Sequence, residues 1–390
     1  MAATPDALAL YVHIPYCARK CPYCDFNVHV ARPVPELDYT RALLKELEAH
    51  ARSPHWRGRR LRSIFFGGGT PSLFAPGSIG AVVERAVSLF SFAEPIEISL
   101  EANPGKEDSA RFKGYRSCGV NRISVGAQSF QPRLLKYLGR LHTADDTRNA
   151  LEAARGLGFA SVNVDLIYAL PSQSVAELEA DIREALSFAP EHLSAYSLTF
   201  EEGTPFGRDY RKGKIDPLPE ETEVAMAIRV EEIALAHGLE RYEISNYARP
   251  GFHSRHNENY WRCGDYLGIG AGAHSYKRAD GGSGVWGYRW QNEKKPARYM
   301  QRIQETGTAV CASEELDRAA AAGESMFLGL RMTRGICRDE FARRFGASPE
   351  TLYPVIAQLI DEGLMEKSGS RLRLSARGLL VADSIFVHFV

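Results

Sequence analysis

The 390-residue chain is long enough to bury a large hydrophobic core and predicts two or three domains. It carries 48 lysines plus arginines against 48 aspartates plus glutamates, so its net charge indicates neither a nucleic-acid partner nor an electrostatic membrane anchor. No apolar run approaches the roughly 18–20 residues that span a bilayer, and the N-terminus lacks a signal-peptide pattern. We therefore expect no transmembrane segment, while peripheral contact with a membrane stays open.

A short apolar strand over residues 8–14 leads into a loop with three cysteines, Cys17, Cys21 and Cys24, spaced C-x3-C-x2-C. Three thiolates on one tight loop are typical ligands of a [4Fe–4S] cluster, and Phe26 stands where a further cysteine would close the site. One iron would then stay open to a ligand. A zinc knuckle or three incidental thiols is the alternative. The remaining cysteines lie scattered, as expected of core residues in a reducing cytoplasm.

Up to about residue 215, strand patterns alternate with helical patterns. The expected strands are residues 8–14, 63–66, 96–100, 122–125, 161–167 and 193–199. The expected helices are residues 37–51, 79–90, 109–117, 145–157 and 175–188. Six such units predict an α/β fold, an open (β/α)6 partial barrel resembling a TIM barrel, because eight strands are needed for closure. Chemistry is then expected at the C-terminal ends of the strands.

The ends of these strands carry residues that suit ligand binding. The second strand ends in Gly-Gly-Gly-Thr at residues 67–70, where glycines let a ligand approach the backbone and leave N–H groups free to donate. Glu101 ends the third strand, and Asp165 lies among apolar neighbours in the fifth; burying either is costly unless it meets a partner or a ligand. A glycine run alone is usually a turn, and a lone acid is usually paired within the core. Their occurrence at consecutive strand ends favours a site.

Two further regions follow the barrel, giving predicted domains of 1–215, 216–312 and 313–390. The middle region, rich in aromatic, histidine and glycine residues with little period, predicts an irregular accessory region that suits a planar aromatic ligand or is a packed loop region. The last region predicts helices over 317–330, 338–345 and 348–362 and then a hairpin, the layout of a winged helix. Residues 348–362 contain no lysine or arginine, which favours packing against the barrel over nucleic-acid binding.

The C-x3-C-x2-C loop after a first strand resembles the radical S-adenosylmethionine (SAM) superfamily. The stretch Tyr-Val-His-Ile-Pro-Tyr-Cys at residues 11–17 resembles its branch of oxygen-independent coproporphyrinogen III dehydrogenases and HemW-type heme chaperones, over nearly the whole chain. The resemblance implies a partial barrel, a [4Fe–4S] cluster, and SAM chelating the open iron. It implies that Gly68, Gly69 and Thr70 cradle the amino group of SAM. It also implies SAM contacts for Tyr11, Tyr23, Glu101, Gln128, Arg140, Asp165 and Thr199, with Arg140 able to hold a carboxylate.

Three features favour the chaperones within this branch. Phe26 replaces a cysteine that the dehydrogenases usually carry, Cys17 lies almost at the start, and residues 256–261 match the H-N-x-x-Y-W element of HemW-type proteins. The resemblance then implies heme binding, delivery to apo-proteins such as respiratory cytochromes, and an unidentified electron donor. His256 is the first candidate axial ligand of heme, followed by His253 and His274. The alternative is an oxygen-independent coproporphyrinogen III dehydrogenase.

Overall fold

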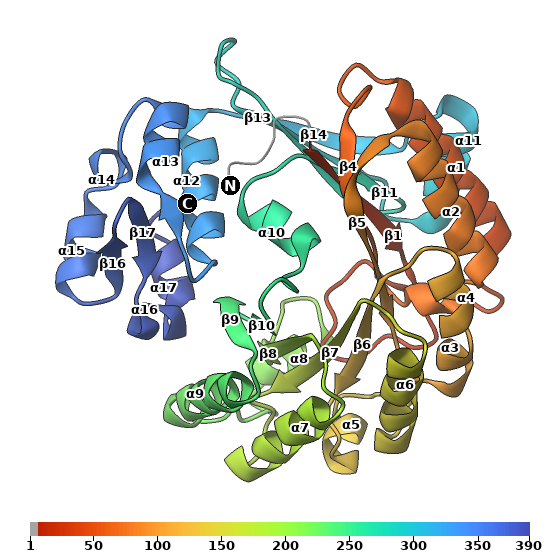
Figure 1. The fold of residues 1–390 in the computed structure, drawn as a ribbon, viewed down its shortest axis with the longest axis horizontal. Coiled ribbons are helices and arrows are strands. Elements are labelled where there is room, and N and C mark those ends of the chain that lie inside the picture. Colours follow the sequence, from red (N-terminus) through yellow and green to blue (C-terminus); the bar gives the residue numbers. More distant parts are fainter. Residues whose placement is uncertain (1–6) are drawn as a thin grey trace.

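The computed structural model describes residues 7–390, apart from the side chains of residues 93 and 94. Its main sheet is curved into an open barrel with helices on the outer face (Figure 1). Six neighbouring parallel strands form its centre: β1 (Ala7–Ile14), β4 (Arg60–Gly68), β5 (Ser91–Ala102), β6 (Arg122–Gln128), β7 (Ser161–Tyr168) and β8 (His192–Ser197). The predicted partial barrel is confirmed.

The outer helices bury one apolar stripe each against the sheet. In α1 (Glu36–Arg52), Tyr39, Leu43 and Leu47 recur every four residues and lie fully in the core. Thr143 and Ser174 begin two helices with capping boxes, which satisfy the first free N–H groups. The other barrel helices are α2 (Pro76–Leu89), α3 (Lys106–Ala110), α4 (Phe112–Ser117), α5 (Pro132–Tyr137), α6 (Ala144–Gly156), α7 (Val175–Ser187) and α8 (Pro205–Arg211).

Two helices that the sequence predicted as continuous are interrupted. Residues 109–117 are divided between α3 and α4 at Arg111, whose guanidinium donates to the carbonyl oxygens of Ser72 (2.7 Å) and Leu73 (2.9 Å). Residues 348–362 are divided between α14 (Pro349–Leu352) and α15 (Val355–Asp361). Pro354 lies at that break because it has no N–H to continue a helix.

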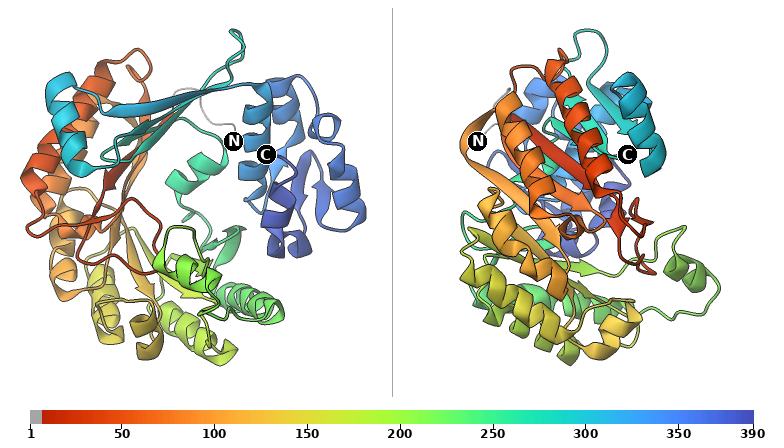
Figure 2. Two further views of the ribbon diagram at one scale, coloured as in Figure 1. Left: turned by 180° about the vertical axis from the view of Figure 1, so that it is seen from behind. Right: turned by 90° about the vertical axis from the view of Figure 1, so that its right-hand side faces the viewer.

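The accessory region is more regular than predicted, since it extends the sheet at both edges. Beyond β8 lie the antiparallel strands β10 (Asn246–Ala248) and β9 (Glu240–Glu243), preceded by α9 (Glu220–Ala236). Beyond β1 lie β11 (Tyr266–Ile269), β12 (His274–Arg278), β13 (Gly287–Asn292) and β14 (Val310–Leu316), with α11 (Pro296–Thr306) before β14. The short helix α10 (Arg255–Trp261) lies inside the curve of the sheet and contacts β4 and α12 (Figures 1 and 2).

The C-terminal region packs around a second hydrophobic core, which Cys263 and Tyr276 of the accessory region share, and it has the predicted order of helices and hairpin. It comprises α12 (Arg318–Leu330), β15 (Ile336–Cys337), α13 (Arg338–Phe345), α14, α15, β16 (Met365–Ser368), β17 (Arg371–Leu374), α16 (Ala376–Leu380) and α17 (Ala382–Phe386). The three strands form one small sheet in the order β15-β17-β16. Across the described residues, no helix combines the length and apolar character needed to cross a membrane.

Candidate functional site

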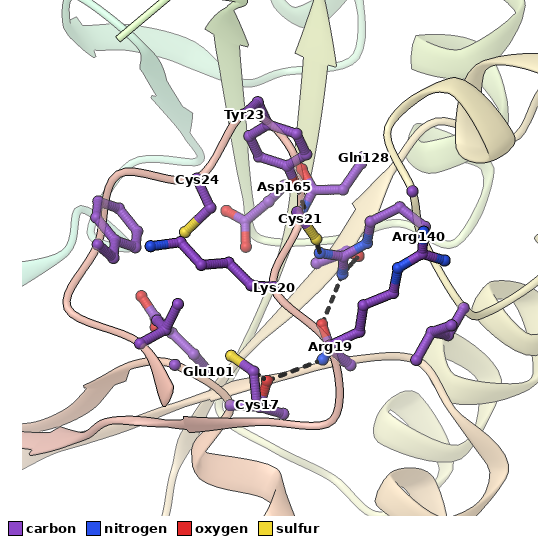
Figure 3. A pocket seen from close by; sticks show the side chains of 18 of the residues that line it. Cys17, Arg19, Lys20, Cys21, Tyr23, Cys24, Glu101, Gln128, Arg140 and Asp165 are labelled. Atoms are coloured by element: carbon purple, nitrogen blue, oxygen red, sulfur yellow. Dashed lines mark hydrogen bonds between the residues drawn. The ribbon is translucent and has the colours of Figure 1, made fainter. Parts of the chain in front are cut away.

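The three predicted cluster cysteines line one cavity of about 780 Å³ at the C-terminal ends of the barrel strands. Cys17 ends the short strand β2 (Tyr16–Cys17), which pairs with β3 (His29–Val30), and Cys21 and Cys24 follow in the loop (Figure 3). The loop therefore folds back across the barrel mouth. All three thiols are free and partly exposed.

The donor set of this loop fits an iron–sulfur cluster. Burial raises the pKa of Cys17 to about 11 and also raises that of Cys24, so both thiols stay neutral until a metal centre displaces their protons. Within the described part of the chain, no three histidine, cysteine or acidic side chains converge to hold a single metal ion. Three separate thiolates on one loop suit a cubane cluster, which takes each thiolate at a different iron.

The glycine run after β4 forms a close-fitting wall of the cavity. Gly68 has a φ of +110°, and a Cβ there would lie 2.4 Å from the His13 ring. A Cβ on Gly69 would lie 2.6 Å from the carbonyl oxygen of Tyr16. Only glycine fits at both positions, so the backbone has the close-fitting shape predicted for the SAM cradle.

The prediction that these residues leave free N–H donors is wrong. The Gly68 N–H donates to Glu101 Oε2 at 3.1 Å. The Gly69 and Thr70 N–H groups donate to the carbonyl oxygens of Ile14 and Tyr16, at 2.8 Å each. The run is thus tied to β1 and to the cysteine loop. An amino group bound here has to find acceptors, such as the carboxylate of Glu101.

Two partly buried acids, Glu101 on β5 and Asp165 on β7, face the cavity. Burial and then the charge of Asp165 raise the pKa of Glu101 to about 8. Burial raises the pKa of Asp165 even though it accepts hydrogen bonds from Ser124 (2.8 Å) and Asn163 (2.7 Å). A cationic ligand would stabilise both charges. SAM, with its sulfonium and amino group, fits this requirement.

Arg140 anchors the cluster loop through protein contacts. Its guanidinium donates to Asn103 Oδ1 (2.6 Å), the Gly126 carbonyl oxygen (3.0 Å), the Tyr23 hydroxyl (3.4 Å) and Cys21 Sγ (3.8 Å). The bidentate carboxylate contact inferred from the resemblance would have to replace some of these bonds. Sequence reasoning gave Asn103 no role, although it lies two residues beyond Glu101 and so on the same side of the extended chain.

Most of the predicted site residues meet in this cavity. Its lining includes Cys17, Cys21, Cys24, Tyr23, Gly68, Gly69, Thr70, Glu101, Gln128, Arg140, Asp165 and Thr199. Gln128 has a left-handed φ of 65°, which is unusual for a residue other than glycine. Thr199 lies beyond the end of β8. Tyr11 and His256 are not among the lining residues; the Tyr11 hydroxyl instead bonds His13 Nδ1 at 2.9 Å beneath the cavity.

His256 lies deep inside the barrel, packed on Phe65 of β4 with ring centroids 4.9 Å apart. Its Nδ1 bonds Ser63 Oγ and its Nε2 bonds the Tyr260 hydroxyl, both at 2.9 Å. Burial lowers its pKa to about 3, so the ring is neutral. Because both nitrogens are engaged, His256 could ligate heme iron only after losing one bond. Its predicted ligand role is therefore not supported by this arrangement.

A residue that sequence reasoning missed ties the cysteine loop to the accessory region. Asn27 Nδ2 donates to the carbonyl oxygens of Ala271 and Lys294 at 2.9 Å each. Gly272 (φ +78°) packs so closely that a Cβ would lie 2.4 Å from this nitrogen. These partners lie 244 and 267 positions away in sequence, so no local pattern could reveal them.

Comparisons with known proteins agree with this geometry. The family model described as the radical SAM superfamily matches residues 11–185, which carry the cysteine loop and most of the barrel. The model of the HemN C-terminal domain matches residues 316–381. A solved structure, the radical SAM enzyme coproporphyrinogen III oxidase (HemN) from Escherichia coli, covers all of the chain and 91% of its own length with a TM-score of 0.82. At 23% identity, that likeness shows the fold. Fold and cysteine loop define a radical SAM protein.

Relatives of known function narrow this class. The heme chaperone HemW of Escherichia coli is 35% identical over 385 residues, covering 98% of each chain. HemW of Bacillus subtilis is also 35% identical, over 97% of this chain and 98% of its own. The mitochondrial radical S-adenosyl methionine domain-containing protein 1 of Bos taurus is 34% identical, covering 98% of this chain and 87% of its own length. The chain belongs to the HemW family of radical SAM proteins.

Proposed function

We propose that the protein is a heme chaperone, which binds heme and passes it to apo-proteins while carrying a [4Fe–4S] cluster and SAM. The observation that supports this most strongly is the full-length similarity to HemW chaperones, 35% identical over 98% of both chains. The cysteine loop agrees, because Phe26 follows the three cysteines where the dehydrogenases of the branch usually carry another. Heme is thus the expected cargo.

Different residues of the cavity would bind the cluster and SAM. Cys17, Cys21 and Cys24 would ligate three irons and leave the fourth to SAM. When bound, the cluster and SAM together supply one-electron reductive chemistry at a sulfonium. Glu101 would accept from the amino group of SAM, and ionises more readily once that cation is bound. Arg140 keeps the loop in place through its bonds to Cys21 and neighbouring groups.

The acceptors of heme and the source of electrons form a finer part of the proposal. We propose delivery to apo-hemoproteins of the respiratory chain and reduction of the cluster by a separate electron donor. We also propose the cytoplasm as the location, since all seven cysteines are free thiols in the structure and a reducing compartment preserves both thiols and the cluster.

The decisive experiment uses the full chain, reconstituted anaerobically with iron, sulfide and SAM. Heme is titrated against one sample while another is incubated with coproporphyrinogen III and a reductant. Saturable one-to-one heme binding, followed by transfer to an apo-b-type cytochrome, supports the chaperone. Turnover of coproporphyrinogen III to protoporphyrinogen, without stable heme binding, would overturn it in favour of the dehydrogenase.

A further inference from the structure

The N-terminal end of the barrel carries a group of arginines that the cofactor site does not use. They come from four parts of the chain, namely β4, α10 and its C-cap, the loop before β15, and β17. The group, here called the arginine cluster, consists of Arg62, Arg255, Arg262, Arg334 and Arg371. Among the side chains that the structure describes, the acids whose charges act on Arg62 are Glu97 and Glu258, and Glu258 also acts on Arg334. Among these described groups, positive charge is in excess.

Several guanidinium atoms in this cluster lack partners. The Nε atoms of Arg262 and Arg334 are buried without a hydrogen bond, and Arg62 has no hydrogen bond or ion pair to any side chain that the structure describes. Burial and the charges of neighbouring arginines lower the pKa of both Arg62 and Arg334. Partly buried cations crowded together with too few anions are costly, and a bound anion with several oxygens would lower that cost.

The carboxylate of Glu258 joins His253 to Arg262 of the arginine cluster. Glu258 Oε2 accepts from Arg262 at 2.8 Å, while Glu258 Oε1 accepts from His253 Nδ1 at 3.3 Å. Arg371 of β17 donates to the carbonyl oxygen of Arg334 at 2.7 Å, which joins the C-terminal region to the cluster. Burial alone would raise the pKa of Glu258, but the hydrogen bond from His253 and the charges of Arg262 and Arg334 hold it at about 2.

His253 differs from His256 in the state of its second nitrogen. Its ring lies flat on Tyr242, with centroids 4.2 Å apart and planes 8° apart, and 38% of its side chain is exposed. Nδ1 is oriented by the Glu258 carboxylate, and Nε2 contacts no described hydrogen-bond partner. A histidine whose Nδ1–H donates to a carboxylate and whose Nε2 is open has the geometry of a metal ligand. His256 has neither nitrogen open.

We propose that heme binds at the N-terminal end of the barrel, with His253 as axial ligand and its propionate carboxylates on the arginine cluster. This inference rests on the proposed function and specifies where the cargo sits. Heme has a binding group for each part of this site. Its iron binds an imidazole nitrogen, and its two propionate carboxylates bind guanidinium groups. The proposed site lies away from the cysteine loop. Ser63, which contacts His256, lies five residues before Gly68 on β4. At ~3.3 Å per residue, the strand spans about 16 Å between them.

The propionate contacts are tested by titrating the cluster-loaded full chain with heme and with heme dimethyl ester, whose propionates carry no charge. We expect the wild-type protein to bind heme at least tenfold more tightly than the ester, with an advantage that shrinks as salt is added. The double variant Arg62→Met/Arg334→Met should bind the two alike. Arg298→Met, at an exposed position of α11, is the matched control and should keep the preference. A wild-type protein that binds both forms alike at low salt would overturn the site without any variant.

The axial ligand is tested by the absorption and EPR spectra of bound ferric heme. His253→Ala should shift the Soret band and change the spin state, whereas His256→Gln should leave both as in the wild type. Far-ultraviolet circular dichroism and iron content show whether each variant is folded and loaded. An unchanged spectrum in His253→Ala, or a heme preference kept by the arginine double variant, overturns the inference while the chaperone function stands. Absence of any heme binding by the wild type would instead remove the proposed function itself.

Discussion

The two ends of the barrel differ in the sign of their uncompensated charge. At the C-terminal end, Glu101 has a pKa of about 8, raised by burial and then by the neighbouring charge of Asp165. At the N-terminal end, the arginine cluster crowds positive charge, and the pKa of Glu258 is about 2. Each end would be stabilised by a ligand of the opposite sign. The sign of the uncompensated charge therefore distinguishes the proposed site for cationic SAM from the proposed site for anionic heme.

Between the two ends lies a layer of buried and partly buried aromatic residues. Tyr11, Phe65, His256 and Tyr260 pack together inside the barrel. The hydrogen bonds of His256 to Ser63 and Tyr260 fix α10 against β4. In this arrangement the H-N-x-x-Y-W element closes the barrel from below. If heme binds at the proposed site, this layer keeps it away from the SAM site.

The largest expected effect comes from Cys21→Ala. Loss of one cluster ligand should remove nearly all cluster iron, measured by iron and sulfide analysis and by EPR. Heme affinity should be unchanged, because the proposed heme site lies at the other end. Cys311→Ala, at an exposed position on β14, is the control and should keep both. A folded Cys21→Ala protein that no longer binds heme would show that the ends are not independent.

Glu101→Gln tests the acidic end through pH. The folded-state pKa of Glu101, about 8, lies above the ordinary value of 4.5, so the protonated carboxyl is favoured in the fold. The stability linked to this group is fully present below pH 4.5 and is lost as the pH rises through about 8. The Gln variant should consequently have a higher melting temperature than the wild type at pH 9 and a similar one at pH 4.

Binding of SAM should respond to the same variant in the opposite direction. The wild-type affinity for SAM, measured by calorimetry on cluster-loaded protein, should rise as the pH rises towards 8, because the ionised carboxylate attracts the amino group. Glu101→Gln should bind SAM at least tenfold more weakly with little pH dependence, a factor corresponding to about 1.4 kcal/mol. A Gln variant with wild-type affinity and pH profile would remove Glu101 from the site.

The sequence was sufficient for the parts of the molecule that local pattern determines. The six parallel strands have apolar cores and helices of regular period between them. The cysteines follow a strand, and Glu101 and Asp165 lie within strands β5 and β7. The edge strands could not be predicted, because pairs such as Ala9 with Tyr266 join distant segments. For the same reason, the sequence could not show that His253, and not His256, has an open ring nitrogen. A motif marks His256, but only the fold reveals that Ser63, far away in the sequence, occupies its nitrogen.

A smaller effect is expected from Gly272→Ala, which disturbs the bond between the cysteine loop and the accessory region. The added Cβ would meet Asn27 Nδ2 at 2.4 Å, and the φ of +78° disfavours alanine. We expect a loss of about 1–3 kcal/mol in the free energy of unfolding and faster cluster loss to a chelator. Gly284→Ala has a similar φ of +81° but nothing within 4 Å, so it isolates the backbone cost. Equal cluster lifetimes in the two variants would contradict a role for this contact.

The smallest and most specific effect concerns Glu258→Gln at the basic end. If His253 is the axial ligand, the Glu258 carboxylate that accepts from its Nδ1 makes the imidazole a stronger donor and favours ferric heme. The Gln variant should therefore raise the reduction potential of bound heme, measured by spectroelectrochemistry, while heme affinity changes little, because removing one negative charge also strengthens attraction of the propionates to the arginine cluster. Glu314→Gln, on the exposed strand β14, gives the matched charge change elsewhere and should leave the potential alone. A reduction potential that does not change in Glu258→Gln would mean that this carboxylate only pairs with Arg262 and does not tune an axial ligand. The two ends of the barrel would then differ in charge, without His253 binding the heme iron.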